Sequence, residues 1–239
     1  MAKIVGGIGT SHSPQLSMPP EDWGKRAEWD RTTSLFSFAE AVQDAPMDID
    51  LEITPEMFAV KHKRCQAAIK VLHQTYVTLK PDVVIVVGDD QSELFSDGLI
   101  PTFAIYTGQA MIDSPRPIAS LHASSVAAEW AYHGIESVSR PGQAELGIHL
   151  ITSLQQEDFD VAQLSHTGGQ SVGHAFTFIH RRIMVDPIVS LLPVMVNTDH
   201  SPNIPSTKRC WDFGVALRRA IDSWPSDLRV LLVASGGLT

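Results

Sequence analysis

The sequence is poor in cysteine and in positive charge. Two cysteines, Cys65 and Cys210, occur in 239 residues, which excludes a disulfide framework and any CxxC metal motif. We interpret both as reduced, buried thiols of a cytosolic protein. The 18 lysines and arginines are outnumbered by 27 acidic residues, which gives a net charge of −9. Because an acidic surface repels phosphate backbones, we expect no nucleic-acid partner.

Long hydrophobic runs are also absent. No apolar stretch approaches the ~20 residues that a membrane helix requires, and the N-terminal run is too short and too glycine-rich for a secretory signal. The sequence therefore predicts a soluble, cytoplasmic protein with no membrane partner. With 44% hydrophobic residues, a chain of 239 residues can build one large core, and we expect residues 1–239 to form a single domain.

What the sequence does contain is a repeated pattern: a short β-branched apolar run that ends abruptly in small and polar residues. Continuous Val, Ile and Leu runs indicate strands covered on both faces. Helices are predicted between them, and residues 13–50 are predicted to form a long excursion over the ligand face with one helix near 35–43. Strands alternating with helices predict an α/β fold with a largely parallel or mixed sheet. The predicted strands are 3–8, 82–87, 103–106, 160–164, 191–196 and 229–233, and the main helices 55–79, 120–132, 144–156 and 206–223.

The residues that follow these strands have side chains suited to chemistry. In open α/β sheets, ligands bind beyond the carboxyl ends of the strands. Adjacent residues at a strand end point in opposite directions, so at most one of the Asp89 and Asp90 carboxylates can reach a given ligand. We expect this carboxylate to orient a ligand histidine by accepting a hydrogen bond from the free N–H of its imidazole ring. The predicted active-site edge carries His12, Asp89, Asp90, His166 and His200.

A further histidine lies on the predicted helix over 55–79. Apolar residues recur there at spacings of three and four, and His62 falls on the same buried stripe. Taken alone, His62 is either a hydrogen-bonded core histidine or a metal ligand, and His12 is either a ligand or a turn residue. Two neutral histidines and one carboxylate are the ligand set of non-haem Fe(II) oxygenases. No local motif joins two histidines fifty residues apart, so spacing leaves these alternatives open.

Six segments, in order along nearly the whole chain, resemble a known family. They are GTSHSPQLSMPPEDW (9–23), TPEMFAVKHKRCQAAI (54–69), VVIVVGDDQSELF (83–95), GHAF (173–176), NTDHSPN (197–203) and ASGGL (234–238). The family is that of the class III extradiol ring-cleaving dioxygenases, which includes the protocatechuate 4,5-dioxygenase catalytic subunit. Within it, the segments are most similar to gallate and 3-O-methylgallate dioxygenases.

The resemblance implies an Fe(II) site in which His12 and His62 are ligands. The third ligand, a glutamate, is expected beyond Thr239, so that the chain would be a catalytic domain truncated at its C-terminus. The resemblance also implies that His200 is the catalytic acid–base and that His174 lies beside the substrate. From the residues alone, His200 could instead bond its own turn, and His174 could cap a helix.

The implied reaction opens a catechol-type ring with O2, as in the catabolism of lignin-derived aromatics, on gallate, 3-O-methylgallate or protocatechuate. His200 would take up a substrate proton and return it. Lys208 and Arg209 are candidate partners for a substrate carboxylate, or else solvated helix residues. Two alternative functions stay open: a metal-poor homologue that acts as a binding protein, and a zinc hydrolase using the same pocket. A homodimer or a small accessory subunit is also left open.

Overall fold

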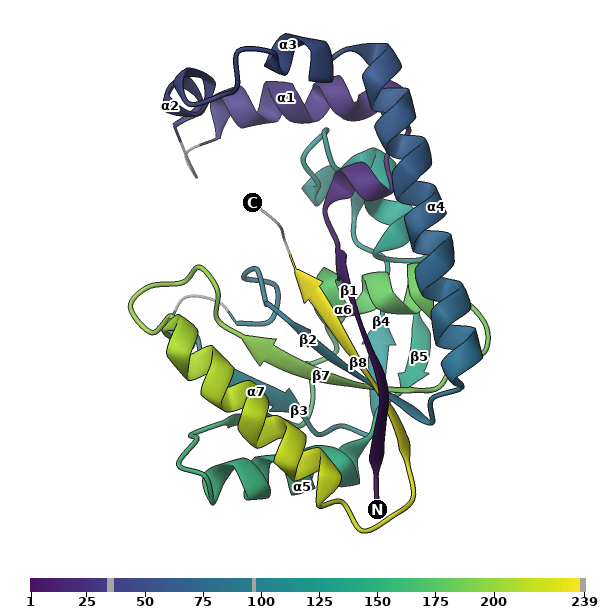
Figure 1. The fold of residues 1–239 in the computed structure, drawn as a ribbon, viewed down its shortest axis with the longest axis vertical. Coiled ribbons are helices and arrows are strands. Elements are labelled where there is room, and N and C mark those ends of the chain that lie inside the picture. The colour runs from purple at the N-terminus through teal and green to yellow at the C-terminus, as the bar shows by residue number, and fades with distance from the viewer. Residues whose placement is uncertain (34–36, 96–97, 237–239) are drawn as a thin grey trace.

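A six-stranded sheet forms the centre of the molecule, which is described as a computed structural model over residues 1–33, 37–95 and 98–236 (Figure 1). Its strands are β1 (Lys3–Ser11), β2 (Val83–Gly88), β3 (Phe103–Tyr106), β6 (Ala162–Leu164), β7 (Ser190–Val196) and β8 (Arg229–Gly236). Their spatial order is β1-β8-β2-β7-β3-β6. β1, β8, β2 and β7 are parallel, whereas β3 runs antiparallel to β7 and carries β6 parallel to itself. The predicted α/β fold with a mixed sheet is therefore confirmed.

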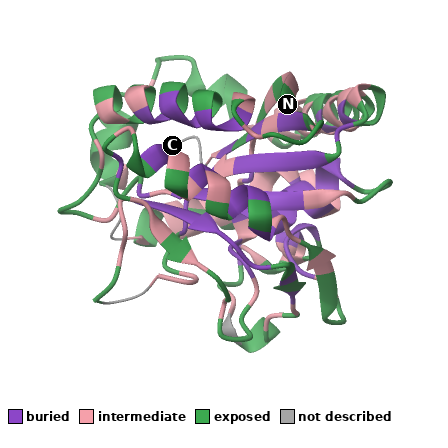
Figure 2. Ribbon diagram, turned by 90° about the horizontal axis from the view of Figure 1, so that it is seen from below, coloured by how far each residue is buried: buried purple, intermediate pink, exposed green. Residues whose placement is uncertain are grey.

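The central strand β2 explains why its sequence is continuously apolar. Val84 and Val86 face one hydrophobic cluster, and Val83 and Ile85 face the other. The first cluster is covered by α4 (Pro55–Leu79), α6 (His174–Phe178) and the π-helical turn η5 (Ile179–Ile183). The second is covered by α5 (Ala144–Gln155) and α7 (Thr207–Asp222). Figure 2 shows the buried strands between these two helical layers.

Helix α4 begins and ends at the predicted residues. The Thr54 hydroxyl accepts a hydrogen bond from the backbone three residues on, at 3.2 Å, which caps the helix. Lys80 ends it in the left-handed conformation, with φ at 44°. Ile69 and Tyr76, both on the predicted apolar stripe, are buried. The stripe therefore faces the core as predicted, and His62 lies half-buried near its N-terminal end.

The predicted helix over 120–132 is wrong. The chain forms two short 3-10 turns there, η3 (Ile118–Ser120) and η4 (Val126–Ala131). Between them, the His122 ring contacts the Ser124 hydroxyl at 2.8 Å and accepts from the Ser124 backbone N–H at 3.2 Å. Such local bonds offer the backbone an alternative to the helical ladder.

The excursion over 13–50 is more helical than predicted. It contains η1 (Pro14–Leu16), η2 (Pro20–Asp22), α1 (Trp23–Thr32), α2 (Phe38–Gln43) and α3 (Ile49–Glu52). α1 was missed because its charged and apolar residues form no stripe. The predicted helix over 35–43 corresponds to α2, except that residues 35 and 36 lie outside the described part of the chain. In Figure 1, α1–α3 form an arm at the N-terminal end of α4.

A second, two-stranded sheet was also missed. It pairs β4 (Ala110–Asp113) with β5 (Val138–Pro141) in antiparallel orientation. The two thiols, predicted to be buried, are free, but Cys210 is exposed on α7 and Cys65 only half-buried on α4. Among the described helices, none has the length and apolar character needed to cross a membrane.

Candidate active site

The parallel strands bring three chain segments to one edge of the sheet. Ser11, at the end of β1, is in register with Gly236 of β8, and Ser235 with Gly88 at the end of β2. Gly88 is also in register with Met195 of β7. The residues that follow β1, β2 and β7 therefore lie side by side, as the pattern of strand ends predicted.

His166 does not belong to this edge, so its placement with the other strand ends was wrong. It follows β6, which runs parallel to β3 and hence opposite to β7. The reversal occurs because β3 inserts antiparallel into the sheet. His166 is exposed, and its ring accepts the backbone N–H of Gly168 at 3.3 Å.

His12 is buried, at 2% exposure, and its tautomer follows from a chain of hydrogen bonds. The Ser235 hydroxyl donates its proton to the Ala175 carbonyl at 2.7 Å. It must therefore accept from His12 Nδ1, 3.1 Å away, which leaves Nε2 with a lone pair. Burial, together with the nearby charge of His174, lowers the pKa of His12 to about 4, although the charges of Asp89 and Glu93 act in the opposite direction. His12 is thus a neutral imidazole at neutral pH.

The lone pair of His12 faces the loop after β2. Gln91 Nε2 lies 3.4 Å from His12 Nε2 and also donates to Asp89 Oδ2 at 3.1 Å. The other oxygen, Asp89 Oδ1, is 3.8 Å from His12 Nε2 and is buried without a hydrogen-bond partner in the described part of the chain. Asp90 instead accepts the backbone N–H groups of Leu94 and Phe95. The two carboxylates therefore diverge as predicted, and it is Asp89 that faces the histidine.

His174 packs edge-on against His12, with ring centroids 4.7 Å apart. One oxygen of Glu93 accepts both its backbone N–H, at 2.7 Å, and its ring Nδ1–H, at 2.8 Å. Arg116 donates to the other oxygen at 3.1 Å. Burial alone would raise the pKa of Glu93, but the His174 bonds and the Arg116 charge lower it overall, so the group is a carboxylate. His174 therefore keeps its proton on Nδ1, and it does not cap α6, because Gly173 occupies that position.

Tyr132 contacts both His12 and His174. Its hydroxyl donates to the His12 carbonyl at 2.7 Å, and its ring lies 5.2 Å from that of His174. Burial raises the pKa of Tyr132, so the phenol remains a donor throughout the neutral range. The backbone of His12 is thereby fixed as firmly as its side chain.

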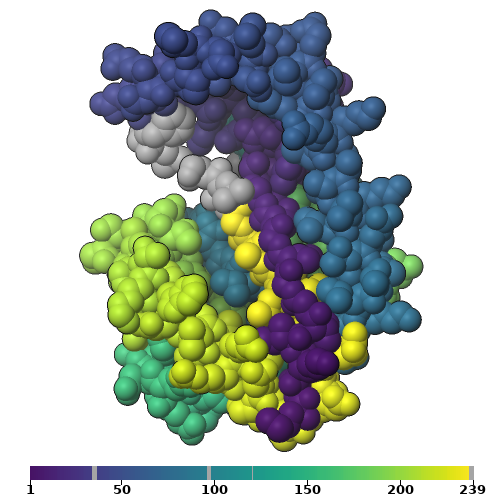
Figure 3. Space-filling view, in the orientation of Figure 1, coloured from purple at the N-terminus to yellow at the C-terminus, as the bar shows by residue number. Residues whose placement is uncertain are grey.

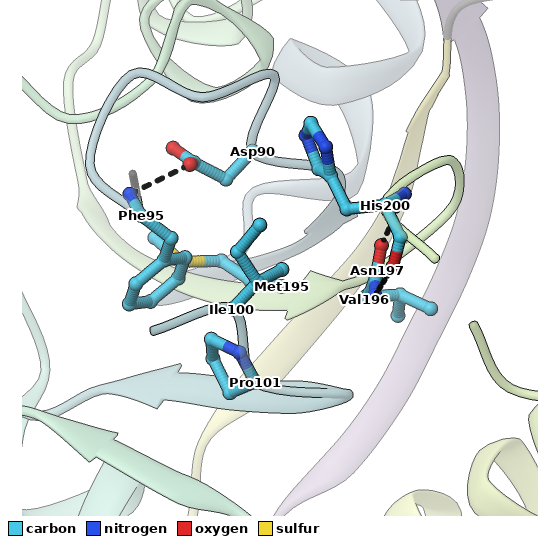
Figure 4. Close-up of a pocket in the computed structure, with 8 residues that line it drawn as sticks. All are labelled: Asp90, Phe95, Ile100, Pro101, Met195, Val196, Asn197 and His200. Carbon is cyan, nitrogen blue, oxygen red and sulfur yellow. Dashed lines mark hydrogen bonds between the residues drawn. The ribbon is translucent and has the colours of Figure 1, made fainter. Parts of the chain in front are cut away.

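His200 lies in a turn held by Asn197. The Asn197 side chain donates to the His200 carbonyl at 2.7 Å and accepts its backbone N–H at 2.9 Å (Figure 4). The His200 ring lies 3.2 Å from the Ser92 hydroxyl and 3.3 Å from Asp199. Its backbone thus bonds its own turn, while its ring reaches the loop after β2. A cavity of about 10 Å³, the size of one water, lies beside His200.

One short loop, residues 89–93, therefore contacts three of the predicted histidines. Asp89 and Gln91 face His12, Ser92 faces His200, and Glu93 holds His174. Ser92 has φ at 60°, a left-handed conformation that is unusual for a serine and costs energy at functional turns.

His62 lies apart from this group. Its ring is edge-on to Trp23, 6.4 Å between centroids, and its Nε2 is 3.2 Å from Gln66 Nε2. Because Gln66 Oε1 accepts from Arg182 at 2.7 Å, the amide nitrogen is the donor and His62 Nε2 the acceptor. Gln66 also donates to the carbonyl of Leu16, in the segment that follows His12. Within the described residues, no hydrogen bond or ring contact joins His62 to His12, and no three His, Cys, Asp or Glu side chains are arranged to hold a metal.

Lys208 and Arg209 are held by other groups. Lys208 pairs with Asp212 on the exposed side of α7. Arg209 donates to the Asp158 carbonyl at 2.9 Å and stacks 3.9 Å over the Phe159 ring. They are ordinary surface residues of that helix rather than free cations beside His200.

Residues 6–239 match the family described as the catalytic LigB subunit of aromatic ring-opening dioxygenase, and the chain belongs to that family. A relative is the gallate dioxygenase of Pseudomonas putida, which is 36% identical over 101 residues. The match covers 41% of this chain and 28% of the relative, so it spans under a third of that protein.

Several residues of the site escaped the sequence reasoning. Glu93 and Gln91 follow the Asp-Asp pair that was weighed, but no local spacing relates them to histidines some 80 residues away. Tyr132 fell in the wrongly predicted helix.

Proposed function

We propose that this protein is an extradiol dioxygenase that uses a ferrous ion and O2 to open the ring of a catechol-type aromatic such as gallate, 3-O-methylgallate or protocatechuate. The supporting observation is the neutral, buried His12 at the carboxyl edge of the sheet, whose unprotonated Nε2 faces an Asp89 oxygen that has no hydrogen-bond partner within the described segments. Membership of the ring-opening family and the similarity to a gallate dioxygenase support the reaction type.

The residues present fit a metal ion in their chemistry. The unprotonated His12 Nε2, which has the Gln91 amide beside it at 3.4 Å, and Asp89 Oδ1, which is buried without a hydrogen-bond partner among the described residues, are both atom types that ligate metal ions. We propose His12 and His62 as ligands, together with a glutamate carboxylate. His62 Nε2 now accepts the Gln66 amide, so ligation through that nitrogen requires it to leave this donor. A bound ferrous ion would offer adjacent positions to the substrate diol and to O2.

The chain's own residues would transfer protons to and from the substrate. His200, from its turn, takes a proton from a substrate hydroxyl and returns it after ring opening. His174, with Nδ1–H held by Glu93, presents an Nε2 lone pair to a second substrate hydroxyl. Tyr132 and Ser235 hold His12 from both sides and prevent its rotation.

Metal analysis combined with oxygen uptake tests the proposal. Full-length protein purified without oxygen should contain iron, and it should consume O2 with gallate, 3-O-methylgallate or protocatechuate. Product analysis should show cleavage beside the diol rather than between its two carbons. A protein free of metal and inactive on all three substrates would favour the binding-protein alternative, and zinc without O2 uptake would favour the hydrolase.

A further inference from the structure

Arg182 joins the segment that follows β1 to helix α4. Its guanidinium group donates to the Leu16 carbonyl at 3.1 Å and to the Ser17 hydroxyl, and it also donates to Gln66 Oε1, on α4, at 2.7 Å. Gln66 Nε2 in turn donates to the same Leu16 carbonyl at 2.8 Å. Figure 3 shows the N-terminal segment, in purple, lying against α4, in blue. The two segments that these bonds join are those that carry the two histidines proposed as ligands.

The charge of Arg182 is not paired with an acid. The side chain is 7% exposed, and its hydrogen bonds in the described portion of the chain go to neutral groups alone. It lies 4.6 Å over the Trp130 ring, whose Nε1 donates to the Ser17 carbonyl at 3.0 Å. Because a buried cation without an anion costs free energy of folding, stability does not explain this residue. The groups that its hydrogen bonds orient offer a better explanation.

The bond from Arg182 decides which end of the Gln66 amide faces His62. A guanidinium group can only donate, so it selects the amide oxygen, and the NH2 group is left for the Leu16 carbonyl and the imidazole. His62 Nε2, 3.2 Å from that NH2 group, accepts the hydrogen bond, and the proton of the neutral ring is therefore on Nδ1. Free histidine favours the proton on Nε2, where it would block a metal ion. The amide thus keeps a proton off the nitrogen that is proposed to bind the metal.

We propose that Gln66 and Arg182 are positioning residues of the metal site: Gln66 keeps the proton of His62 on Nδ1, and Arg182 fixes the amide in the direction that this requires. The inference rests on the proposed function for the role of His62 as a ligand. In the metal-free protein the amide donor occupies the place of the metal at Nε2. The shared bonds to the Leu16 carbonyl keep α4 and the segment after β1 in contact, so the same pair of residues also restrains both ligand-bearing segments.

The tautomer of His62 tests the role of Gln66 without any metal or substrate. Proton–nitrogen NMR of the metal-free protein, at a pH of about 8.5 where imidazoles are ordinarily neutral, distinguishes a proton on Nδ1 from one on Nε2. Wild-type His62 should carry its proton on Nδ1. Gln66→Glu keeps an acceptor for Arg182 but places a second acceptor at His62, so Nε2 should become protonated. The matched control is Gln74→Glu, the same change at an exposed position of α4, which should leave the tautomer as in the wild type.

Metal affinity tests the role of Arg182. Arg182→Met frees the Gln66 amide to rotate, and Co(II) binding by the metal-free protein, followed by visible absorption, should weaken about 10- to 100-fold, the usual cost of losing an orienting partner. Arg182→Lys keeps a donor for the Gln66 oxygen and should recover most of the affinity. Arg181→Met is the control, because it breaks bonds to Asp113 and to the Trp130 carbonyl on the same turn without touching Gln66. Its Co(II) affinity should match that of the wild type.

The two measurements can each overturn the inference. A proton on Nε2 of wild-type His62, or an unchanged tautomer in Gln66→Glu, would refute the role of Gln66. Wild-type Co(II) affinity in Arg182→Met, or an equal loss in Arg181→Met, would refute the role of Arg182. If the tautomer and the affinity change as expected in a protein that consumes no O2 with any catechol, the proposed dioxygenase activity fails while this inference stands.

Discussion

The carboxylate of Glu93 binds His174 twice, through one oxygen that accepts both the backbone N–H and the ring Nδ1–H of the histidine. This double contact fixes the position, the tautomer and the orientation of a ring that lies edge-on to His12. It also ties α6 to the loop after β2.

Replacing Glu93 should therefore reduce turnover without removing any group that touches substrate. Glu93→Gln keeps a hydrogen-bond acceptor but loses the charge, and Glu93→Ala loses both. We expect kcat to fall about 10- to 100-fold for the alanine variant, as is usual for partners that orient site histidines, and less for the glutamine variant. Steady-state oxygen uptake measures this. Glu129→Gln is the control, because it alters the same Arg116 without touching His174; an equal loss there would mean that general destabilisation is the cause.

His200→Phe should retain iron and lose most turnover, about 10²- to 10⁴-fold, the range of a general acid–base. The reason is that, in the part of the chain that the structure describes, the polar contacts of the His200 ring are to Ser92 and Asp199, so its removal leaves the hydrogen bonds of His12 and His174 in place. Oxygen uptake and iron content are measured together. His166→Phe, at the opposite edge of the sheet, should change neither the rate of oxygen uptake nor the iron content. Near-normal rates in His200→Phe would refute its catalytic role.

Ser235 should control the affinity of the site for iron. Ser235→Ala removes the acceptor of His12 Nδ1–H and frees the ring to change tautomer. Iron affinity should fall about 10- to 100-fold, measured by anaerobic titration of the apoprotein. Ser235→Thr keeps the hydroxyl and should restore binding. If alanine and threonine variants bind iron equally, the hydroxyl has no orienting role.

His180 should make stability depend on pH. It is 1% exposed, and both its ring nitrogens lack partners within the described residues. Burial lowers the pKa of His180 from 6.5 to about 4, with the charge of Arg140 acting in the same direction and Asp113 against it. Between these values the unfolded chain binds a proton that the folded protein does not, so the free energy of unfolding is highest above pH 6.5 and falls as the pH drops to 4.

The expected loss from this group alone is on the order of 3 kcal/mol. His180→Leu should flatten the profile over pH 4–6.5, although His12 contributes a remaining slope in the same direction. At pH 7 the variant should be at least as stable as the wild type, because it removes two buried nitrogens without partners. Chemical denaturation at several pH values measures both effects, and identical slopes for the two proteins would contradict the assignment.

Much of the fold could be predicted because its determinants are local. α4 begins and ends as predicted since Thr54 caps it and its apolar residues repeat at helical spacing. β2 was recognisable because a strand covered on both faces must be apolar throughout. Where local side-chain bonds compete with the helix, as at His122 and Ser124, periodicity misled the prediction.

The sequence alone determined which residues follow each strand and what kinds of side chain they carry. From these residues it could also be expected that His12 and His200 share an edge of the sheet. Which groups meet there was decided only by the tertiary structure. The antiparallel insertion of β3 sends His166 to the opposite edge, and the parallel register of β1, β8 and β2 brings Ser235 and the loop 89–93 to His12. Contacts between residues 80 to 220 positions apart depend on strand order and direction, and no local pattern of residues encodes these.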